Sequence, residues 1–381
     1  MQVKLVQGIE RIDAAAWDAC AGADNPFVGH TFLSIMEASG SASGETGWLP
    51  LHVLVEDDGG QVHGCAPMYV KSHSYGEYVF DWGWADAFER AGGRYYPKLQ
   101  ISVPFTPVPG PRLMVRPGAD IDAVRAALIA GIASACEQLN TSSAHITFCG
   151  QDEQEALGEH GFLRRMGVQY HWHNRSYRDF DDFLDVCKSA KRKQMRKERA
   201  KVRDQGIEIE TLSGSDIERH HWQAFWPFYL ATVDKRWGNA YLTRDFFAMI
   251  GERMPERVVL VMARADGAYV GGALNLRGAD TLYGRIWGCL DDYRFLHFEA
   301  CYYAAIDYAI ATGLKHVEAG AQGTHKLQRG YEPVATYSAH WISHPGLRDA
   351  VERFVHDERI QMRAEMENLK GMLPFREDAP A

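Results

Sequence analysis

Residues 259–276 read VLVMARADGAYVGGALNL, two apolar runs on either side of an Asp-Gly pair. Short apolar runs joined by Asp-Gly predict a β-hairpin, because Gly readily adopts the positive φ angles of a tight turn. Residues 51–68, LHVLVEDDGGQVHGCAPM, repeat this pattern. At one constant offset, and without a gap, Val53, Asp58, Gly59, Val62 and Gly64 fall on Val261, Asp266, Gly267, Val270 and Gly272. The chain therefore predicts two related hairpins.

The same elements follow each hairpin. In the second half, apolar residues recur at helical spacing over residues 298–310, Gly313 stands where a C-terminal cap belongs, and an apolar strand is expected over residues 315–319. In the first half the helix is expected over residues 124–136 and the strand over residues 144–148. Two copies of hairpin, helix and strand predict an α/β protein of two similar units.

The length of 381 residues also favours two domains, because single hydrophobic cores rarely grow to this size. We assign the first unit to residues 1–175, the second to residues 176–345, and a C-terminal helix with a tail to residues 346–381. That helix is expected to pack its apolar side chains against the rest of the protein: Val351, Phe354, Val355 and Ile360.

Composition and charge restrict the classes of function. The formal charge of −9 argues against a general DNA-coating role, although it leaves room for a local basic face. The first residues lack the apolar stretch of a signal peptide, and no apolar run is long enough to span a bilayer. The seven cysteines are scattered and odd in number, which favours reduced thiols over a disulfide framework. We therefore expect a cytoplasmic protein.

Several kinds of active site have no counterpart in the sequence. The chain contains no Gly-x-Ser-x-Gly, His-Glu-x-x-His or Cys-x-x-Cys motif, no phosphate loop, and no Gly-x-Gly-x-x-Gly turn of the dinucleotide-binding kind. The pairs His171-x-His173 and His220-His221 lack a third ligand at metal-site spacing. The sequence predicts neither a metal site nor a covalently bound cofactor.

The densest group of reactive side chains begins at Glu318 in EAGAQGTHKLQRGYEP. A strand that ends in a Gly-rich loop places side chains and backbone N–H groups at one rim of a sheet, where open α/β sheets bind ligands. There Glu318, His325, Lys326 and Arg329 would serve acid–base chemistry and stabilise negative charge. We expect Lys326 to be accessible to solvent. The competing interpretation is a tight turn whose charges face water.

Two further segments have both a functional and a structural interpretation. Residues 75–112 are rich in Gly, Pro and aromatic residues and form either the wall of a pocket or a rigid surface excursion. Residues 188–203 contain nine Lys or Arg residues and form either a solvated helix that joins the domains or a contact surface for phosphate-rich ligands. The candidate contacts on this surface are Lys191, Arg192, Lys193, Arg196 and Arg199.

These features together resemble the FemABX-like peptidoglycan aminoacyl and peptidyl transferases. The resemblance rests on the tandem units, the basic helix, the ending Lys326-x-x-x-Gly330-Tyr331, and the strings that begin at Tyr95 (YYPKL), Pro104 (PFTPV) and Gly320 (GAQGTHK). It covers nearly the whole chain. It implies two tandem GNAT-like (acyl-CoA N-acyltransferase) units with central mixed sheets flanked by helices. It also implies an N-acyltransferase of cell-wall precursor metabolism, which moves an acyl or aminoacyl group to an amine by direct attack.

The resemblance also suggests roles for individual residues. Lys326 matches a lysine that lies by the reactive carbonyl in better-known relatives, and Glu318 or His325 would accept the proton. The Pro-rich segment resembles the acceptor-binding region. The expected substrate contacts are Lys98, Tyr96, Arg112, Trp84, Arg285, Arg329 and Tyr331.

Two departures from the relatives leave the acyl donor open. The second unit lacks the long helical insertion of those relatives, which argues against a donor carried on tRNA. Residues 292–298 lack the glycines that cradle a pyrophosphate, so a standard CoA site is not predicted. Acyl-CoA, an acyl carrier and aminoacyl-tRNA remain as donors, and tRNA or a lipid-linked precursor as a polyanionic ligand. The alternatives are a CoA- or carrier-dependent N-acyltransferase unrelated to peptidoglycan, and a non-catalytic protein that binds RNA or anionic lipid.

Overall fold

The computed structural model describes all residues except 237–239, 321–322 and 378–381. Its contacts divide the chain into two compact units. Unit 1 consists of residues 1–168 and 335–364, and unit 2 of residues 169–334 and 365–381. Neither unit is one continuous segment, in contrast to the simple division expected at residues 175 and 345. The boundaries fall inside two strands, β9 (Leu163–His173) and β15 (Glu332–Ile342), and inside the helix α12 (Pro345–Lys370).

Unit 1 contains two sheets. The first has the strand order β1-β3-β4-β7 and is antiparallel throughout. Its strands are β1 (Gln2–Val6), β3 (His52–Glu56), β4 (Val62–Ala66) and β7 (Met114–Val115). Between β1 and β3 the chain forms a 3-10 turn, η1 (Ile9–Arg11), and two helices, α1 (Ala14–Ala21) and α2 (His30–Ala38). The hairpin expected around Asp58-Gly59 is therefore the β3–β4 pair.

The second sheet of unit 1 has the order β2-β5-β6-β8, and β8 pairs on its other side with the unit 1 part of β15. Its strands are β2 (Trp48–Pro50), β5 (Met68–Lys71), β6 (Lys98–Ile101) and β8 (Ser143–Cys149). The helices are α3 (Trp82–Arg90), α4 (Ile121–Gln138) and α5 (Gln151–Glu159). Helix α4 begins at the N-cap Asp120, and it buries Val124, Leu128 and Ile132 in the core that includes Leu99 of β6.

Unit 2 is built around one mixed sheet. Strands β10 (Ile207–Ser213), β11 (Val258–Ala265), β12 (Ala268–Arg277) and β13 (Thr281–Cys289) pair antiparallel in sequence order. Strand β14 (His316–Glu318) joins β13 in parallel and pairs antiparallel with the unit 2 part of β9. The remaining elements are α6 (Phe180–Asp185), α7 (Ser189–Asp204), η2 (Gly214–Asp216), α8 (Arg219–Arg236), α9 (Arg244–Arg253), η3 (Pro255–Arg257), α10 (Leu296–Phe298), the π-helical turn η4 (Glu299–Tyr303), α11 (Ala304–Thr312) and η5 (Thr324–Arg329).

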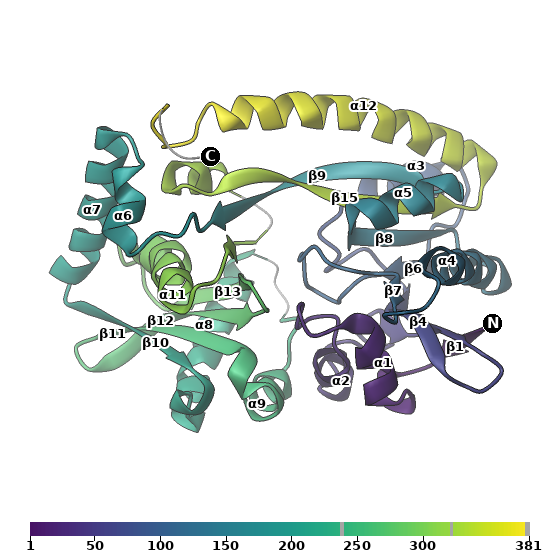
Figure 1. Ribbon diagram of the computed structural model, residues 1–381, viewed down its shortest axis with the longest axis horizontal. Coiled ribbons are helices and arrows are strands. Elements are labelled where there is room, and N and C mark those ends of the chain that lie inside the picture. The colour runs from purple at the N-terminus through teal and green to yellow at the C-terminus, as the bar shows by residue number, and fades with distance from the viewer. Residues whose placement is uncertain (237–239, 321–322, 378–381) are drawn as a thin grey trace. The chain divides into compact units, whose positions relative to one another are not determined.

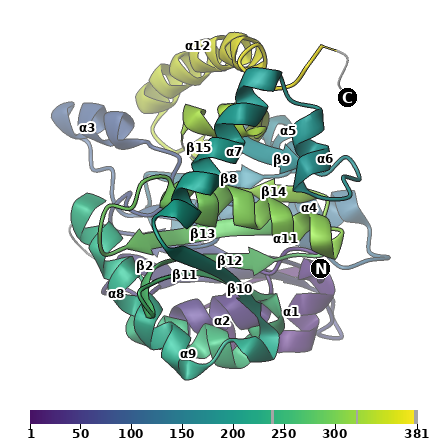
Figure 2. The same ribbon diagram turned by 90° about the vertical axis from the view of Figure 1, so that its left-hand side faces the viewer.

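Helices cover both faces of the unit 2 sheet. Figures 1 and 2 show α11 on one face and α8 with α9 on the other. On the α11 side, Ala300 and Ala304 pack against Val261 and Ala273. On the other side the sheet carries glycines, because a Cβ at Gly288 would meet the backbone of Phe228. The small residues on both faces let the helices lie close to the strands.

The expected repetition of hairpin, helix and strand is confirmed. In each unit the strand after the main helix joins a parallel neighbour: β8 pairs with β6, and β14 pairs with β13. Both hairpins also carry a register irregularity at equivalent positions, after Val55 and after Ala263. A bulge at the same position in both hairpins supports the relation between the two units, because turn residues alone do not produce it.

The C-terminal helix is only partly as expected. In α12, Val351 and Val355 are buried in a core cluster with Trp84 and Tyr95. Phe354 is 48% exposed, but its ring packs edge-on against Trp84 with the ring centres 6.0 Å apart. The prediction for Ile360 was wrong, since this side chain is 57% exposed. Among the described residues, no helix is long and apolar enough to cross a membrane.

Candidate active site

The Gly-rich loop predicted to be reactive lies at the end of β14. This strand ends at Glu318, and the chain re-forms as the short helix η5, which carries His325 and Lys326. Gly330 ends η5 with a φ of 83°, and a Cβ there would lie 2.8 Å from the ring of Phe183. A glycine at this position therefore allows both the turn and the close packing of the loop.

Lys326 is buried, so the prediction that it is solvent-accessible was wrong. Its side chain is 2% exposed, its Nζ donates to Gly320 O at 2.8 Å, and it lies 5.8 Å from the ring centre of Tyr170. In the described part of the chain no carboxylate forms an ion pair with it. Loss of solvent without a counter-ion lowers the pKa of Lys326 to about 7. The amine therefore exchanges its proton near neutral pH.

Glu318 is largely buried, with its side chain 12% exposed, and its pKa is shifted in the opposite direction to that of Lys326. Burial raises the pKa of Glu318 to about 8, against the opposing effect of Arg285, a half-buried residue of β13. Its Oε1 lies 3.8 Å from Nδ1 of His171, and its Oε2 has no hydrogen-bond partner among the described residues. At neutral pH the carboxyl is thus mostly protonated, so it is suited to donate a proton, which corrects its expected role as a proton acceptor.

His171 is the base nearest to Glu318, and sequence reasoning assigned it no role. The register of β14 and β9 places His171 opposite Glu318. Its Nε2 lies 3.3 Å from Gln169 Oε1, and an amide oxygen can only accept a hydrogen bond, so Nε2 is the donor. In the neutral ring Nδ1 then has no proton and faces Glu318. Burial, together with the charges of His173, His316 and Lys326, lowers the pKa of His171 to about 3. The only signal in the sequence was its alternation with His173 in one strand.

His325 is an exposed residue beside the buried lysine. Its Nε2 lies 2.8 Å from the hydroxyl of Tyr302. Partial desolvation lowers the pKa of His325, and the positive charges of Lys326 and Arg329 lower it further. The imidazole is therefore neutral at pH 7 and able to take up a proton.

Arg329 and Tyr331 face the interior. The Nη2 of Arg329 donates to both carboxylate oxygens of Glu198 of α7, at 2.9 Å each, and its Nη1 donates to His325 O at 2.8 Å. Its guanidinium lies 3.5 Å from the ring centre of Phe298. Tyr331 is fully buried. We interpret Arg329 as a residue that holds η5 in place, which argues against the expected direct contact with a substrate.

Two residues expected to contact an acceptor, Lys98 and Arg112, are fully buried in unit 1. The Nζ of Lys98 donates to Glu77 at 2.6 Å and also pairs with Asp81. The guanidinium of Arg112 donates to backbone carbonyls, including Thr147 O at 3.0 Å and Val108 O at 2.7 Å. Both side chains have internal partners and no exposed surface, which corrects their assignment as ligand contacts.

Of the other two unit 1 candidates, Tyr96 lies beside the charged group of Lys98, and Trp84 packs among other rings. Tyr96 is half-buried, and its hydroxyl lies 2.8 Å from Ser74 Oγ, which also accepts a hydrogen bond from Lys98. Trp84 is buried, with its ring centre 5.0 Å from that of His340. Substrate roles for these two residues stay predictions.

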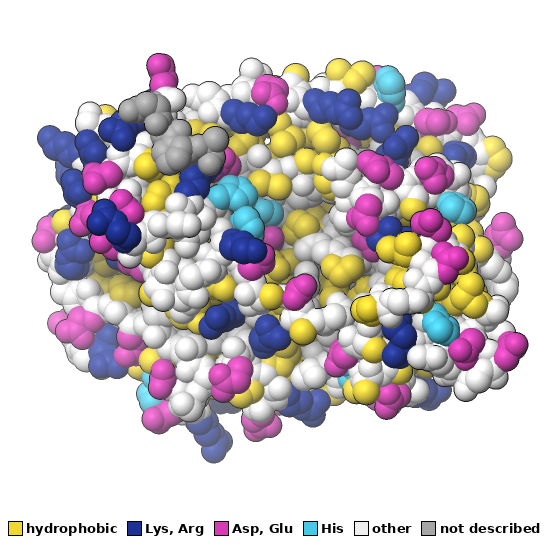
Figure 3. Space-filling view, in the orientation of Figure 1, with side chains coloured by type: hydrophobic (Ala, Val, Ile, Leu, Met, Phe, Trp, Pro, Cys, Tyr) yellow, Lys and Arg dark blue, Asp and Glu magenta, His cyan; other side chains and the backbone are white. Residues whose placement is uncertain are grey.

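The basic surface on α7 is partly neutralised. Arg199 is directed inward, where it pairs with Glu299 at 2.9 Å and Asp307 at 2.6 Å, so it is not a free surface contact. Arg192 and Arg196 pair with acids of α6, at 3.3 Å and 2.8 Å. Lys191 and Lys193 have no ion-pair partner among the described residues. Figure 3 shows the mixture: Lys and Arg side chains follow the left-hand edge, where Figure 1 places α7, with Asp and Glu among them.

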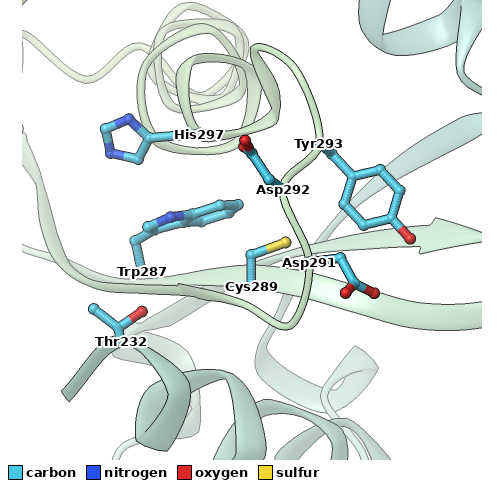
Figure 4. Close-up of a pocket in the computed structure, with 7 residues that line it drawn as sticks. All are labelled: Thr232, Trp287, Cys289, Asp291, Asp292, Tyr293 and His297. Carbon is cyan, nitrogen blue, oxygen red and sulfur yellow. The ribbon is translucent and has the colours of Figure 1, made fainter. Parts of the chain in front are cut away.

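A cavity of about 370 Å³ opens in unit 2 where β13 ends. Sequence reasoning did not find it. Its walls come from the end of β13, from the turn that follows, from α10 and from α8, and the lining residues are Thr232, Trp287, Cys289, Asp291, Asp292, Tyr293 and His297. Figure 4 shows the Trp287 ring between His297 and Thr232, with Asp292 on the His297 side and with Asp291 and Tyr293 beyond Cys289.

The cavity is connected to the reactive loop by a series of rings. The ring centre of His297 lies 5.5 Å from that of Trp287 in the cavity wall and 6.1 Å from that of His325 on η5. Tyr302, which is hydrogen-bonded to His325, lies 5.3 Å from His297. The cavity and the loop that carries Lys326 are therefore adjacent parts of one unit.

Solved structures show the same fold. FemX has 13% identity and a TM-score of 0.55, over 92% of this chain and 100% of that one. L-PGS from Bacillus licheniformis has 9% identity and a TM-score of 0.51, over 88% and 98%. The C-terminal domain of a putative lysylphosphatidylglycerol synthetase from Agrobacterium fabrum has 8% identity and a TM-score of 0.53, over 90% and 94%. At these identities the likeness shows the fold alone.

Comparison by sequence gives the family. No curated protein matches the chain. The sequence profile of the FemAB-like family, described as a family of peptidoglycan biosynthesis or recognition, matches residues 8–377. That span includes both units and every residue of the candidate site. The chain therefore belongs to the FemAB-like family.

Proposed function

We propose that the protein is an N-acyltransferase of cell-wall precursor metabolism, which transfers an acyl or aminoacyl group to an amine by direct attack. The family and the names of the similar structures support this class of reaction. The observation that carries the proposal is that two consecutive elements at the end of β14 hold a buried lysine with no counter-ion among the described residues and a largely buried carboxyl group that keeps its proton. Ionisable groups with strongly shifted pKa values concentrate at functional sites.

Lys326 suits the charge that develops in acyl transfer. When an amine attacks a carbonyl carbon, negative charge builds on the carbonyl oxygen, and a fixed cation in a water-poor site stabilises it more strongly than the substrate. With a pKa of about 7, Lys326 can begin as a neutral amine and take up the proton that the attacking nitrogen loses. The same proton then places the positive charge beside the oxyanion.

Glu318 and His325 complete the proton balance. The attacking amine loses one proton as the new amide bond forms, and the leaving group gains one as the bond to the donor breaks. A protonated Glu318 is suited to give that second proton. His325 is the second candidate to accept the first proton, because its ring is neutral and exposed. The reaction needs no covalent intermediate on the protein.

The experiment offers peptide amine acceptors of the cell-wall precursor type with acyl-CoA, an acyl carrier or aminoacyl-tRNA as donor, and detects the new amide by mass spectrometry. We expect product with one class of donor, and its loss in Lys326→Met. Lys315→Met is the matched control, because Lys315 is an exposed lysine of the same unit. Absence of product with every donor, or full activity of Lys326→Met, would contradict the proposal.

A further inference from the structure

The cavity at the end of β13 combines aromatic rings with two carboxylates. Trp287, Tyr293 and His297 supply the rings, and Asp291 and Asp292 supply the charge. In the part of the chain that the structure describes, neither carboxylate has a hydrogen bond or an ion pair. The nearest arginine in sequence, Arg294, lies over the ring of Phe295 at 4.9 Å. The two negative charges are thus available to a ligand.

The same turn is poorly suited to bind phosphate. A phosphate cradle at the start of a helix needs backbone N–H groups without other acceptors. Here Arg294 N donates to Gln205 Oε1 at 3.1 Å, Leu296 N to Tyr293 O at 3.2 Å, and Phe298 N to Phe295 O at 3.0 Å. A polyphosphate at this turn would meet two carboxylates, and three of the turn's N–H groups already have acceptors.

Rings and carboxylates together are instead the chemistry that recognises an organic cation. An ammonium group is attracted to the faces of Trp and Tyr rings and to nearby carboxylates. A volume of about 370 Å³ holds a small substrate group rather than a single ion. His297 in the cavity wall lies beside His325 of the Lys326 loop, with the ring centres 6.1 Å apart.

We infer that this cavity binds an ammonium group of a substrate, one that does not itself react. This inference rests on the proposed acyl transfer. The attacking nitrogen must be neutral, whereas two carboxylates keep a bound amine protonated, so the ammonium held here is a second amino group. It belongs either to an aminoacyl donor or to an acceptor that carries two amines. A donor that places phosphates at this turn is disfavoured.

Binding of small unreactive probes tests the inference without any turnover. L-Alaninamide represents the aminoacyl donor, L-lysinamide the acceptor with two amines, and propionamide is the uncharged counterpart of the first. Affinities are measured by titration at low ionic strength with the parent, with Asp291→Asn/Asp292→Asn, and with Asp245→Asn. Asp291, Asp292 and the control Asp245 are all exposed, so each variant is expected to fold.

We expect one ammonium probe to bind the parent about tenfold more tightly than propionamide, and the double variant to lose most of this difference. Asp245→Asn should bind as the parent does, and raised salt should weaken binding. The probe that responds identifies the source of the ammonium. Equal binding of propionamide, or unchanged ammonium affinity in the double variant, would overturn the inference. Lys326→Met should keep this binding even as it loses turnover, which separates failure of the cavity from failure of the proposed reaction.

Discussion

Lys98 in unit 1 and Lys326 in unit 2 are equally hidden from solvent but have opposite surroundings. Lys98 is 0% exposed and lies between the carboxylates of Glu77 and Asp81. Burial lowers its pKa, but the two acids raise it more, so that the pKa of Lys98 lies above its ordinary value. Lys326 is 2% exposed with a backbone carbonyl as its partner, and burial lowers its pKa to about 7.

The difference shows that burial alone does not make a lysine reactive. A buried charge is tolerated when it is paired, and it then becomes part of the structure. A buried amine without a counter-ion gives up its proton easily and can respond to a charge that forms nearby. We therefore assign Lys98 to the stability of unit 1 and Lys326 to the reaction.

The largest expected effect is on stability, from Lys98→Met. This change leaves Asp81 buried without its lysine and Glu77 with only Lys71, at 3.9 Å, which costs roughly 3–5 kcal/mol in unfolding free energy. Chemical denaturation of the parent and the variant measures the difference. Adding Asp81→Asn to the variant should recover part of the loss. If Lys98→Met has the same unfolding free energy as the parent, the contrast between the two lysines does not hold.

Lys326→Met should reduce turnover without reducing stability, in contrast to Lys98→Met. Loss of a group that stabilises an oxyanion reduces turnover by on the order of 10²–10³. The same change removes a buried amine that has no counter-ion among the described residues, so stability should rise. The gain should be largest below about pH 7 and disappear as pH rises to the ordinary lysine value of 10.5. Turnover and denaturation are measured on the same preparations. A variant that loses stability and activity in parallel would mean that Lys326, like Lys98, is structural.

The pH dependence of stability tests the protonated state of Glu318. Its pKa is raised in the folded protein, so its favourable contribution is present below its ordinary value near 4.5 and is lost as pH rises to about 8. Glu318→Gln does not titrate, so the parent should become less stable relative to this variant across that window, by on the order of a few kcal/mol. Denaturation at several pH values measures the change. A constant difference from pH 4.5 to 8 would mean that Glu318 is ionised when folded.

The exposed lysines of α7 should show the smallest effects. Lys193 and Lys197 lie at the surface, where charge interactions are screened. Reversal of both charges should leave stability within about half a kcal/mol of the parent. It should weaken polyanion binding several-fold and flatten the dependence on salt, as filter binding of RNA or sedimentation with anionic vesicles would show. Unchanged affinity for both polyanions would leave α7 as a purely structural helix.

The sequence predicted what local patterns determine. The two hairpins, the helix after each one and the parallel strand that follows were all predictable, because turn residues and apolar periodicity are local properties. The division of β9 and β15 between the two units was not predictable, because pairing between strands far apart in sequence leaves no local pattern. The position of the reactive loop was predicted from its glycines, but the burial of Lys326 depends on distant residues such as Tyr170.

The errors concern charged residues whose partners lie far away in sequence. Lys98 and Arg112 stand in an aromatic, Pro-rich segment, which made them plausible ligand contacts. Their partners include Asp81 upstream and Thr147 downstream, which only the folded chain brings together. The alternation in Lys98-Leu-Gln-Ile, which matches a buried strand with one polar face, was the only available signal.

The most direct test is the pKa of Lys326 itself, measured from the Cε chemical shift of isotope-labelled lysine as pH is raised. The signals of Lys326 and Lys98 are assigned from their loss in Lys326→Met and Lys98→Met. We predict a midpoint near 7 for Lys326 and no titration of Lys98 below its ordinary value of 10.5. A Lys326 that keeps its proton up to pH 10, as Lys98 does, would contradict the assignment of this lysine to the reacting centre.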